Sequence, residues 1–195
     1  KTTCYRNKAQ YPVSFDRQLK IGFFAPRSHR VVDCENCILQ PPIFADIVKI
    51  FRKFIIKNGI TVYDSEKQTG LLRHIYLRRA EATGEVMVCA VINGEDLPHK
   101  NELIEKLTEI PSVKSIVLNI NRDRTNVILG KECVTVWGND CIYDVLCGVK
   151  VRLSPLSFYQ VNHDMAQQLY EKAAEYACLS GKETVLDMYC GTGTI

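Results

Sequence analysis

The sequence predicts an α/β protein, with a central α+β domain followed by the beginning of a second domain built on a parallel sheet. Three observations lead to this prediction. Strand-like and helix-like segments alternate over residues 1–153, and the pattern changes to a helix after Ser154-Pro155. An apolar run at residues 185–188 then leads into Gly191 and Gly193, as a buried parallel strand leads into a glycine turn that receives a nucleotide-like cofactor.

Residues 5–32 are predicted to form antiparallel strands joined by hairpins. Apolar and polar residues alternate loosely there, with turn signals at residues 14–17 and around Gly22. Over the first 32 positions seven Lys and Arg residues face one acidic residue, and five aromatic residues lie among them. This mixture is typical of a surface that neutralises phosphates and stacks on unpaired bases. It equally fits an edge-strand pair with solvated cations.

Two helices and further strands complete the predicted central domain. The first helix begins at Pro41-Pro42, ends at Asn58-Gly59, and has apolar residues at helical spacing between these ends. A second helix is predicted at residues 100–110. Strands are predicted at residues 71–79, 86–92, 113–119, 127–129, 133–137, 142–146 and 149–153. This order suggests an antiparallel sheet covered by helices.

Composition and cysteine usage favour a globular protein of the reducing cytoplasm. The chain has 195 residues, of which 46% are hydrophobic and 24% charged, and no apolar run approaches the roughly 20 residues of a membrane span. Its nine cysteines are an odd number without compact spacing, which does not indicate a disulfide framework. The first residue is not Met and the chain ends abruptly at Ile195, which favours a piece of a longer protein.

Two motifs flank the helix that is predicted at residues 163–179. Before it stands Ser154-Pro155-Leu156-Ser157-Phe158-Tyr159-Gln160-Val161-Asn162, and after it Asp187-Met188-Tyr189-Cys190-Gly191-Thr192-Gly193. The glycine pair alone is weak evidence, because a dinucleotide fingerprint has a third glycine. Together, the motifs resemble the S-P-x-S-F-x-Q-V-N and D-x-Y/F-C-G-x-G segments of the RNA uracil-5 methyltransferases. The resemblance covers nearly the whole chain, and is greatest toward the 23S ribosomal RNA branch.

The resemblance implies a fold and an activity. Residues 1–153 would form the central domain that lies against RNA, and residues 154–195 the first part of a Rossmann-like class I methyltransferase domain. The implied reaction is S-adenosylmethionine-dependent methylation of uridine carbon 5, in 23S ribosomal RNA or alternatively in transfer RNA. In the family a cysteine thiolate adds to carbon 6 and a general base later removes the carbon 5 proton. Both groups lie downstream of the glycine loop there, so we expect no catalytic residue in this chain, which would be inactive alone.

The resemblance also implies which residues contact the cofactor. Gln160 stands at the place of a glutamine whose amide contacts S-adenosylmethionine, and Tyr189 at that of an aromatic ring beside the cofactor. We expect the two side chains to meet in a shared pocket at the carboxyl end of the parallel strand. Asp187, Gly191 and Gly193 would form the loop. Purely local roles remain as alternatives to cofactor contact: Gln160 could be an amide at a strand end, and Asp187 could be a cap.

Substrate contacts are implied at both ends of the chain. Phe158 and Asn162 fall in the first motif and would shape the pocket of the target base, which has to leave its stack for the reaction. Arg6 and Lys8 lie in the basic N-terminal segment and are expected to contact RNA. Packing in the core remains the alternative for Phe158.

The segment Cys34-Glu35-Asn36-Cys37 permits a metal interpretation and a structural one. A lone C-x-x-C is more often a reduced structural pair than half of a metal site. In the family members that carry a 4Fe-4S cluster, one ligand stands at the place of Cys37 and three lie upstream. Cys34 and Cys4 are poor substitutes for the upstream ligands, so a cluster is expected only in a longer parent protein.

Two other functions are compatible with parts of the sequence. The glycine loop alone would also suit a dehydrogenase that uses a dinucleotide. The basic N-terminal segment, without a nucleophile in the chain, would also suit a non-catalytic RNA-binding module. The sequence does not indicate an oligomeric state.

Overall fold

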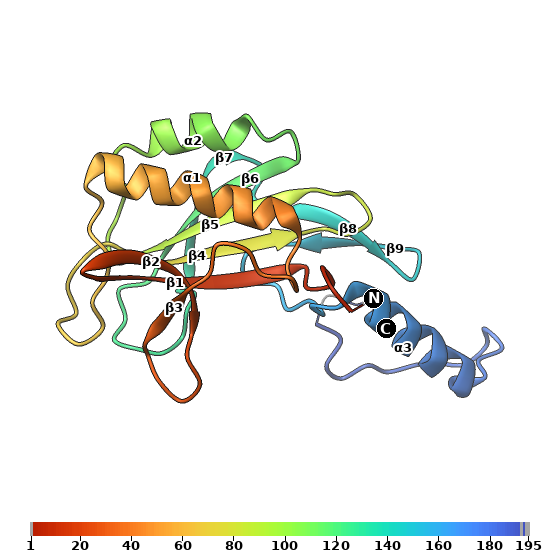
Figure 1. The fold of residues 1–195 in the computed structure, drawn as a ribbon. Helices are drawn as coiled ribbons and strands as arrows, with labels where there is room; N and C mark the ends of the chain where they lie inside the picture. Colours follow the sequence, from red (N-terminus) through yellow and green to blue (C-terminus); the bar gives the residue numbers. More distant parts are fainter. Residues whose placement is uncertain (1, 192, 194–195) are drawn as a thin grey trace.

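A seven-stranded mixed sheet forms the frame of the molecule, with the strand order β3-β2-β1-β4-β5-β6-β7 (Figure 1). The structure is a computed structural model that describes residues 2–191 and 193, so Lys1 of the basic segment, Thr192 of the glycine motif, Thr194 and Ile195 lie outside the described residues. The predicted α/β class is confirmed. The strands of this sheet are β1 Lys8–Asp16, β2 Gln18–Phe24, β3 Val31–Asp33, β4 Leu72–Arg79, β5 Val86–Ile92, β6 Val113–Ile120 and β7 Glu132–Gly138.

Two helices cover one face of the sheet, α1 (Pro42–Asn58) and α2 (Lys100–Thr108) (Figure 1). The predicted limits of α1 are confirmed. Pro42 occupies the first turn, where a missing N–H costs nothing, and Gly59 ends the helix in the left-handed region with a φ of 61°. The apolar side of α1 packs with the inner residues of the sheet into the main core.

Strands β5 and β6 run parallel, which corrects the prediction of an antiparallel sheet. The chain leaves β5, passes through α2 on the covered face and enters β6 at the end of the sheet where β5 began. A helical crossover of this kind joins parallel neighbours, whereas a hairpin joins antiparallel ones. The other neighbouring strands of the sheet pair antiparallel.

The second face of the sheet is partly covered by a separate hairpin, β8 (Ile142–Leu146) and β9 (Val149–Leu153). Both strands have the predicted limits. Their apolar residues pack against Tyr76, Met87 and Cys89 of the sheet to form a smaller second core. Because strand residues alternate between faces, Ile75 and Leu77 of β4 point to the helices while Tyr76 points to this hairpin.

Two local predictions are wrong, each for a steric or hydrogen-bonding reason. Gly22 lies inside β2 and not in a turn, and a Cβ there would stand 1.9 Å from the carbonyl oxygen of Val32 on β3. Residues 127–129 form no strand. The side-chain amide of Asn121 donates to the carbonyl oxygens of Val127 at 2.8 Å and Ile128 at 2.9 Å, which takes the place of a strand ladder.

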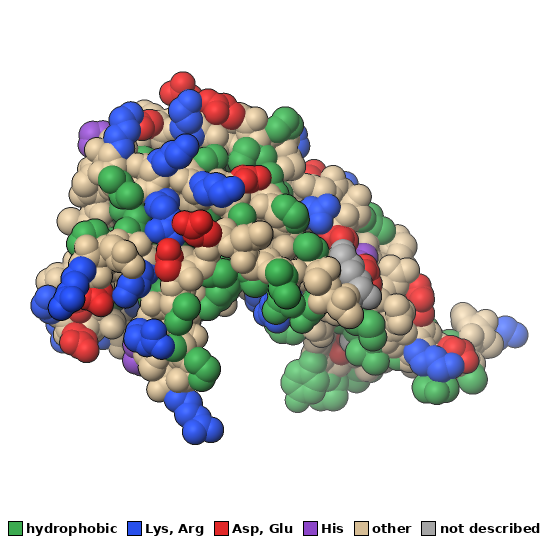
Figure 2. Space-filling model, viewed as in Figure 1, with side chains coloured by type: hydrophobic (Ala, Val, Ile, Leu, Met, Phe, Trp, Pro, Cys, Tyr) green, Lys and Arg blue, Asp and Glu red, His purple; other side chains and the backbone are tan. Residues whose placement is uncertain are grey.

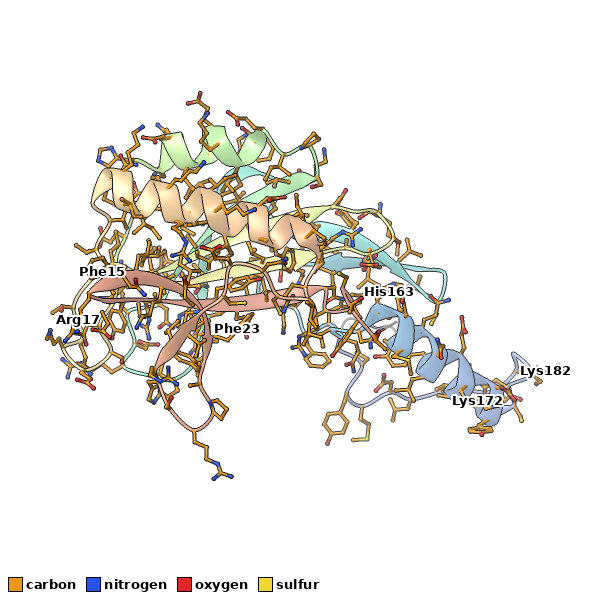
Figure 3. All side chains as sticks on the ribbon, in the orientation of Figure 1. Phe15, Arg17, Phe23, His163, Lys172 and Lys182 are labelled. Carbon is orange, nitrogen blue, oxygen red and sulfur yellow. The ribbon has the colours of Figure 1, made fainter. Side chains whose placement is uncertain are left out.

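The chain ends in helix α3 (His163–Ala177) and an extended tail, which project from one end of the sheet (Figure 1). Figure 2 shows this projection with all atoms, at the lower right of the molecule. The helix was predicted two residues longer. The imidazole of His163, at the start of α3, lies 2.8 Å from the carbonyl oxygen of Val145, and Figure 3 shows this residue beside the sheet, far from Lys182. No helix within the described ranges is long and apolar enough to cross a membrane.

Candidate functional site

A buried arginine fixes the first motif to the second face of the sheet. Arg78 of β4 is 2% exposed, and its guanidinium donates to the carbonyl oxygen of Ser154 at 3.0 Å and to that of Ser157 at 2.7 Å. The Ser157 hydroxyl in turn accepts from the Ser154 N–H at 3.0 Å. A charged donor to two buried carbonyls makes strong, directional contacts, so the motif has a defined position on the sheet.

The next buried residue of the motif is Tyr159. A carboxylate that the sequence analysis missed holds its side chain in place. The Tyr159 hydroxyl donates to Asp144 of β8 at 3.1 Å. Asp144 is fully buried and also accepts from the backbone N–H groups of Glu81 and Ala82. Burial, and secondly the charge of Asp144, raise the pKa of Tyr159 far above its usual range, so the hydroxyl stays protonated. The signal in the sequence was a single acidic residue inside an apolar strand.

The N-terminal segment lies directly beside the end of this motif. Asn7 donates from its side-chain amide to the carbonyl oxygen of Gln160 at 2.9 Å, and from its backbone N–H to that of Val161 at 2.9 Å. Arg6 forms an antiparallel bridge with Asn162. The structure therefore brings together residues that are about 150 positions apart in the sequence, and these include three of the predicted site residues, Arg6, Gln160 and Asn162.

Positive charge gathers at this junction. Lys8 of β1 lies opposite Arg78 of β4 in the register of the two strands, and Arg6 lies two residues before Lys8. Burial lowers the pKa of Lys8, and the charges of Arg78 and Arg6 lower it further. A cation that is repelled by its neighbours in this way gains from the approach of an anion such as a phosphate.

A cavity of about 330 Å³ opens at the same junction. Its lining comes from β1, β2 and the segment before α1, and consists of Arg6, Lys8, Ala9, Gln10, Phe23, Cys37, Leu39 and Gln40. The side-chain oxygen of Gln40 is buried in the structure without a hydrogen-bond partner among the described residues. Phe23 lies on the part of β2 that faces the tail end of the molecule (Figure 3). The arrangement combines cations, amides and an aromatic ring, which is the set of groups that contacts nucleic acid.

Among the other residues of the first motif, some have a local structural role, and the rest make no contact that assigns one. Asn162 is the N-cap of α3, where its side-chain oxygen accepts from the Met165 N–H at 3.2 Å. Phe158 is 69% exposed, so the alternative of core packing is wrong for this residue. The backbone carbonyl of Gln160 is engaged by Asn7, and its side chain is half-buried.

The glycine motif differs from its prediction, because residues 185–188 form no strand. Leu186 is 82% exposed and Tyr189 is 93% exposed. A parallel strand exists only alongside neighbouring strands, and no strand within the described residues pairs with this segment. The structure therefore does not enclose Gln160 and Tyr189 in one pocket.

The local geometry of the loop nevertheless matches a glycine turn. The Asp187 carboxylate accepts from the Tyr189 N–H at 2.9 Å, which is the capping role that the sequence left open. Gly191 and Gly193 have φ values of 54° and 68°, in the left-handed region that favours glycine. A Cβ at Gly193 would meet no atom within 4 Å, so the backbone is open to the approach of a ligand.

The cysteines near the N-terminus do not supply a cluster site. Within residues 2–191 and 193, no group of three or more His, Cys, Asp or Glu side chains is placed to hold a metal ion. Burial, and then the neighbouring Cys37, raise the pKa of Cys34, which favours the thiol over the thiolate that a metal needs. Cys37 instead lines the cavity beside Arg6 and Lys8.

Comparison with known proteins relates the chain to RNA-modifying enzymes. No family model matches it. A Clostridium tetani protein described as an uncharacterised RNA methyltransferase is 47% identical over 193 residues, which are 98% of this chain and 42% of that protein. Proteins of Halalkalibacterium halodurans and Caldanaerobacter subterraneus with the same description are 46% and 45% identical, over 98% of this chain and 42% and 43% of their own. The chain thus spans about two fifths of the length of these curated relatives.

A solved structure has the same fold. The Pyrococcus abyssi tRNA (uracil-54, C5)-methyltransferase, crystallised with S-adenosyl-L-homocysteine, matches 100% of this chain and 45% of its own with a TM-score of 0.82. The two sequences are 29% identical.

Proposed function

Since this chain belongs to the family of these RNA methyltransferases, we propose that the protein methylates carbon 5 of uridine in RNA with S-adenosylmethionine as methyl donor. The observation that carries the proposal is the junction of the two ends of the chain. There the motif around Gln160 lies against the basic strand that contains Arg6 and Lys8. An RNA strand on these cations would pass beside the residues that the family resemblance assigns to the cofactor and the target base.

The described residues would divide the work between cofactor and substrate. Gln160, Tyr189, Asp187, Gly191 and Gly193 would hold S-adenosylmethionine, which supplies the methyl group. The left-handed glycines and the open space at Gly193 fit the approach of such a ligand to the backbone. Because the tail is exposed, it would form only part of the wall around the cofactor.

Four side chains would form the RNA-binding site, three by contact and one by position. Arg6 and Lys8 would neutralise phosphates, and the exposed ring of Phe158 is available to a base that has left its stack. Asn162 would act through position, because its side chain caps α3 and thereby fixes the end of the motif.

The proposed substrate is 23S ribosomal RNA, and the proposed location is the cytoplasm. Transfer RNA is the second candidate, favoured by the likeness to the Pyrococcus abyssi enzyme, which acts on uracil-54 of tRNA by its name. The proposed location rests on the nine cysteines, an odd number without compact spacing, which do not indicate the disulfide framework of a secreted protein. A 4Fe-4S cluster with Cys37 as one ligand is proposed only for a longer parent protein, because the described residues bring no group of three or more ligand side chains together.

Methyl transfer to defined RNAs tests the proposal. A longer protein that contains this chain is incubated with labelled S-adenosylmethionine and with transcripts of 23S ribosomal RNA or of transfer RNA, and 5-methyluridine is measured by mass spectrometry. We expect label in one transcript class and a loss of binding to S-adenosyl-L-homocysteine in the variant Gln160→Ala. Binding of NAD in place of S-adenosyl-L-homocysteine would favour a dehydrogenase, and RNA binding without any methyl transfer would favour a non-catalytic module.

A further inference from the structure

A second cavity lies at the opposite end of the sheet from α3. It has a volume of about 430 Å³, within the range of small-molecule pockets, and three connections build it: the β2–β3 loop at residues 25–30, the segment 59–71 and the segment 121–131. Figure 1 shows these connections gathered at the same end of the sheet, below β1 and β2. None of the residues assigned above to cofactor or RNA lines this cavity.

Aromatic rings form its walls. Phe24 is 44% exposed, and its ring stands edge-on to those of His29 and His74, with centroid distances of 5.8 Å and 6.3 Å. The ring of Tyr63 carries the Arg73 guanidinium at 4.4 Å from its centre. Flat aromatic and guanidinium surfaces of this kind stack on unpaired nucleic acid bases.

His74 lines the cavity and carries two buried ring nitrogens that no described residue engages. A neutral imidazole offers one donor and one acceptor, and leaving both unpaired in a buried place is unfavourable. Burial, and secondly the charge of Arg73, lower the pKa of His74 to about 4, so the ring is neutral in the cell.

An irregularity in β4 brings His74 to the wall of the cavity. Consecutive strand residues normally point to opposite faces, but the register of β4 on β5 shifts between Leu72 and His74, so Arg73 and His74 both line the cavity. The Arg73 guanidinium donates to the carbonyl oxygens of Asn121 and Asp123, at 2.7 Å and 3.0 Å. Arg73 is therefore a positioning residue that orders the loop closing the cavity.

The cavity continues into a more polar space of about 410 Å³. The two share Tyr63, Arg73, Thr125 and other residues, and the second adds Gln68 and Arg124 to the walls. Aromatic rings and the imidazole thus lie inside, and a cation lies at the exit. A nucleotide has the matching layout, because its base is flat with donors and acceptors along the edge and its phosphate is anionic.

We propose that this cavity, the base pocket formed by Phe24, His29, Tyr63, Arg73 and His74, binds one unpaired nucleobase of the RNA substrate. The ring faces of Phe24 and Tyr63 contact the base, the His74 nitrogens pair with its edge, and Arg124 meets the adjacent phosphate. The ligand class rests on the proposed function. The base pocket lies apart from the motif around Gln160, so the bound base is a recognition element and not the base that is methylated.

Binding of single-stranded oligonucleotides tests this proposal. Labelled oligouridylate and oligoadenylate of seven nucleotides are titrated with the whole protein in a fluorescence anisotropy assay at several salt concentrations. Phe24→Ala should weaken binding by about 5- to 100-fold at unchanged salt dependence, because one stacking contact is lost and no charge. The matched control is Phe15→Ala, since Phe15 is 67% exposed and lies at the tip of the β1–β2 hairpin outside the cavity (Figure 3).

Two further variants make the outcome decisive. His29→Ala changes an exposed loop residue of the pocket and should weaken binding even if Phe24→Ala does not fold. Arg124→Ala should reduce the salt dependence by about one phosphate contact. The proposal is wrong if wild-type protein binds neither oligonucleotide at low salt, or if the pocket variants bind as tightly as Phe15→Ala. If a longer protein that contains this chain fails to methylate RNA, but Phe24→Ala still weakens oligonucleotide binding, the proposed function is overturned and the base pocket is supported.

Discussion

The side-chain amide of Asn7 donates a hydrogen bond of 2.9 Å to the carbonyl oxygen of Gln160, so a residue of the basic N-terminal segment holds the backbone of the proposed cofactor-binding residue. This contact crosses the boundary that the sequence suggested at Ser154. It makes the position of Gln160 depend on the strand that would bind RNA.

Replacing Asn7 by Ala should therefore disturb function more than stability. Loss of one partly buried hydrogen bond costs about 1 kcal/mol of unfolding free energy, whereas a shifted Gln160 should lower the affinity for S-adenosyl-L-homocysteine several-fold. Urea unfolding and calorimetric titration measure the two effects. Asn101→Ala on the exposed side of α2 is the control and should change neither.

Arg78→Met should be among the most damaging single substitutions. It leaves the carbonyl oxygens of Ser154 and Ser157 without their charged donor, and we expect a loss of about 3 kcal/mol in unfolding free energy. Arg79→Met is the comparison, because the pair of Arg79 with Glu81 is partly exposed and should contribute less than about 1 kcal/mol. Equal losses in the two variants, measured by urea unfolding, would contradict the clamp that Arg78 forms.

Tyr159 and Asp144 should behave as an energetically coupled pair. Tyr159→Phe removes one donor and should cost about 1 kcal/mol, while Asp144→Ala also leaves the N–H groups of Glu81 and Ala82 unpaired and should cost about 3 kcal/mol. The double variant should lose less than the sum of the two. Strictly additive losses in this double-mutant cycle would show that the hydroxyl and the carboxylate do not interact.

His74 should make the protein less stable in mild acid. Its pKa falls from the ordinary 6.5 to about 4 on folding, mainly through burial. Between these values the unfolded chain binds a proton that the folded chain does not, so the unfolding free energy decreases as the pH falls from 6.5 to 4, by roughly 3 kcal/mol at most. Above pH 6.5 the residue should have no effect. In His74→Phe this part of the slope should vanish, whereas His29→Phe should keep it.

Gly22→Ala should separate β2 from β3. The added Cβ would lie 1.9 Å from the Val32 carbonyl oxygen and 2.8 Å from the Cys34 N–H nitrogen, so the strands would have to move apart at a cost of about 3 kcal/mol or more. Gly84→Ala meets no atom within 4 Å and has only the strain of its φ of 74°, about 1 kcal/mol. Similar melting temperatures for the two variants would refute the steric argument.

Local signals in the sequence predicted most of the elements, while long-range relations were the source of the errors. The pair Pro41-Pro42 and Gly59 set the ends of α1 correctly, because both act within one helical turn. The direction of β6 beside β5 depends on a crossover through α2, which the periodicity of the strands does not contain. Residues 127–129 had a strand-like composition, but the amide of Asn121 took their carbonyl oxygens.

The candidate site was predictable as a set of residues and not as an arrangement. The family motifs placed Gln160 beside functional residues, and Arg6 and Lys8 joined it in space through Asn7, a contact that no local pattern encodes. Asp144 and Arg78 were missed because a lone charge in an apolar strand has no motif. The expected strand at residues 185–188 needs partner strands for its hydrogen bonds, so its apolar composition alone could not form it.

The anchoring of the first motif limits how the molecule can move. Ser154, Ser157, Tyr159 and the backbone at residues 160–162 are each tied to the sheet or its covering hairpin, so the stretch after Leu153 travels with the sheet as one rigid body. The start of α3 is anchored as well, since the His163 imidazole lies 2.8 Å from the Val145 carbonyl oxygen and Ala166 and Tyr170 pack into the second core. Any hinge between Gln160 and the glycine turn would consequently lie beyond Tyr170. Movement about such a hinge would displace the glycine turn while Gln160 stayed on the sheet, so the two parts of the proposed cofactor site would separate.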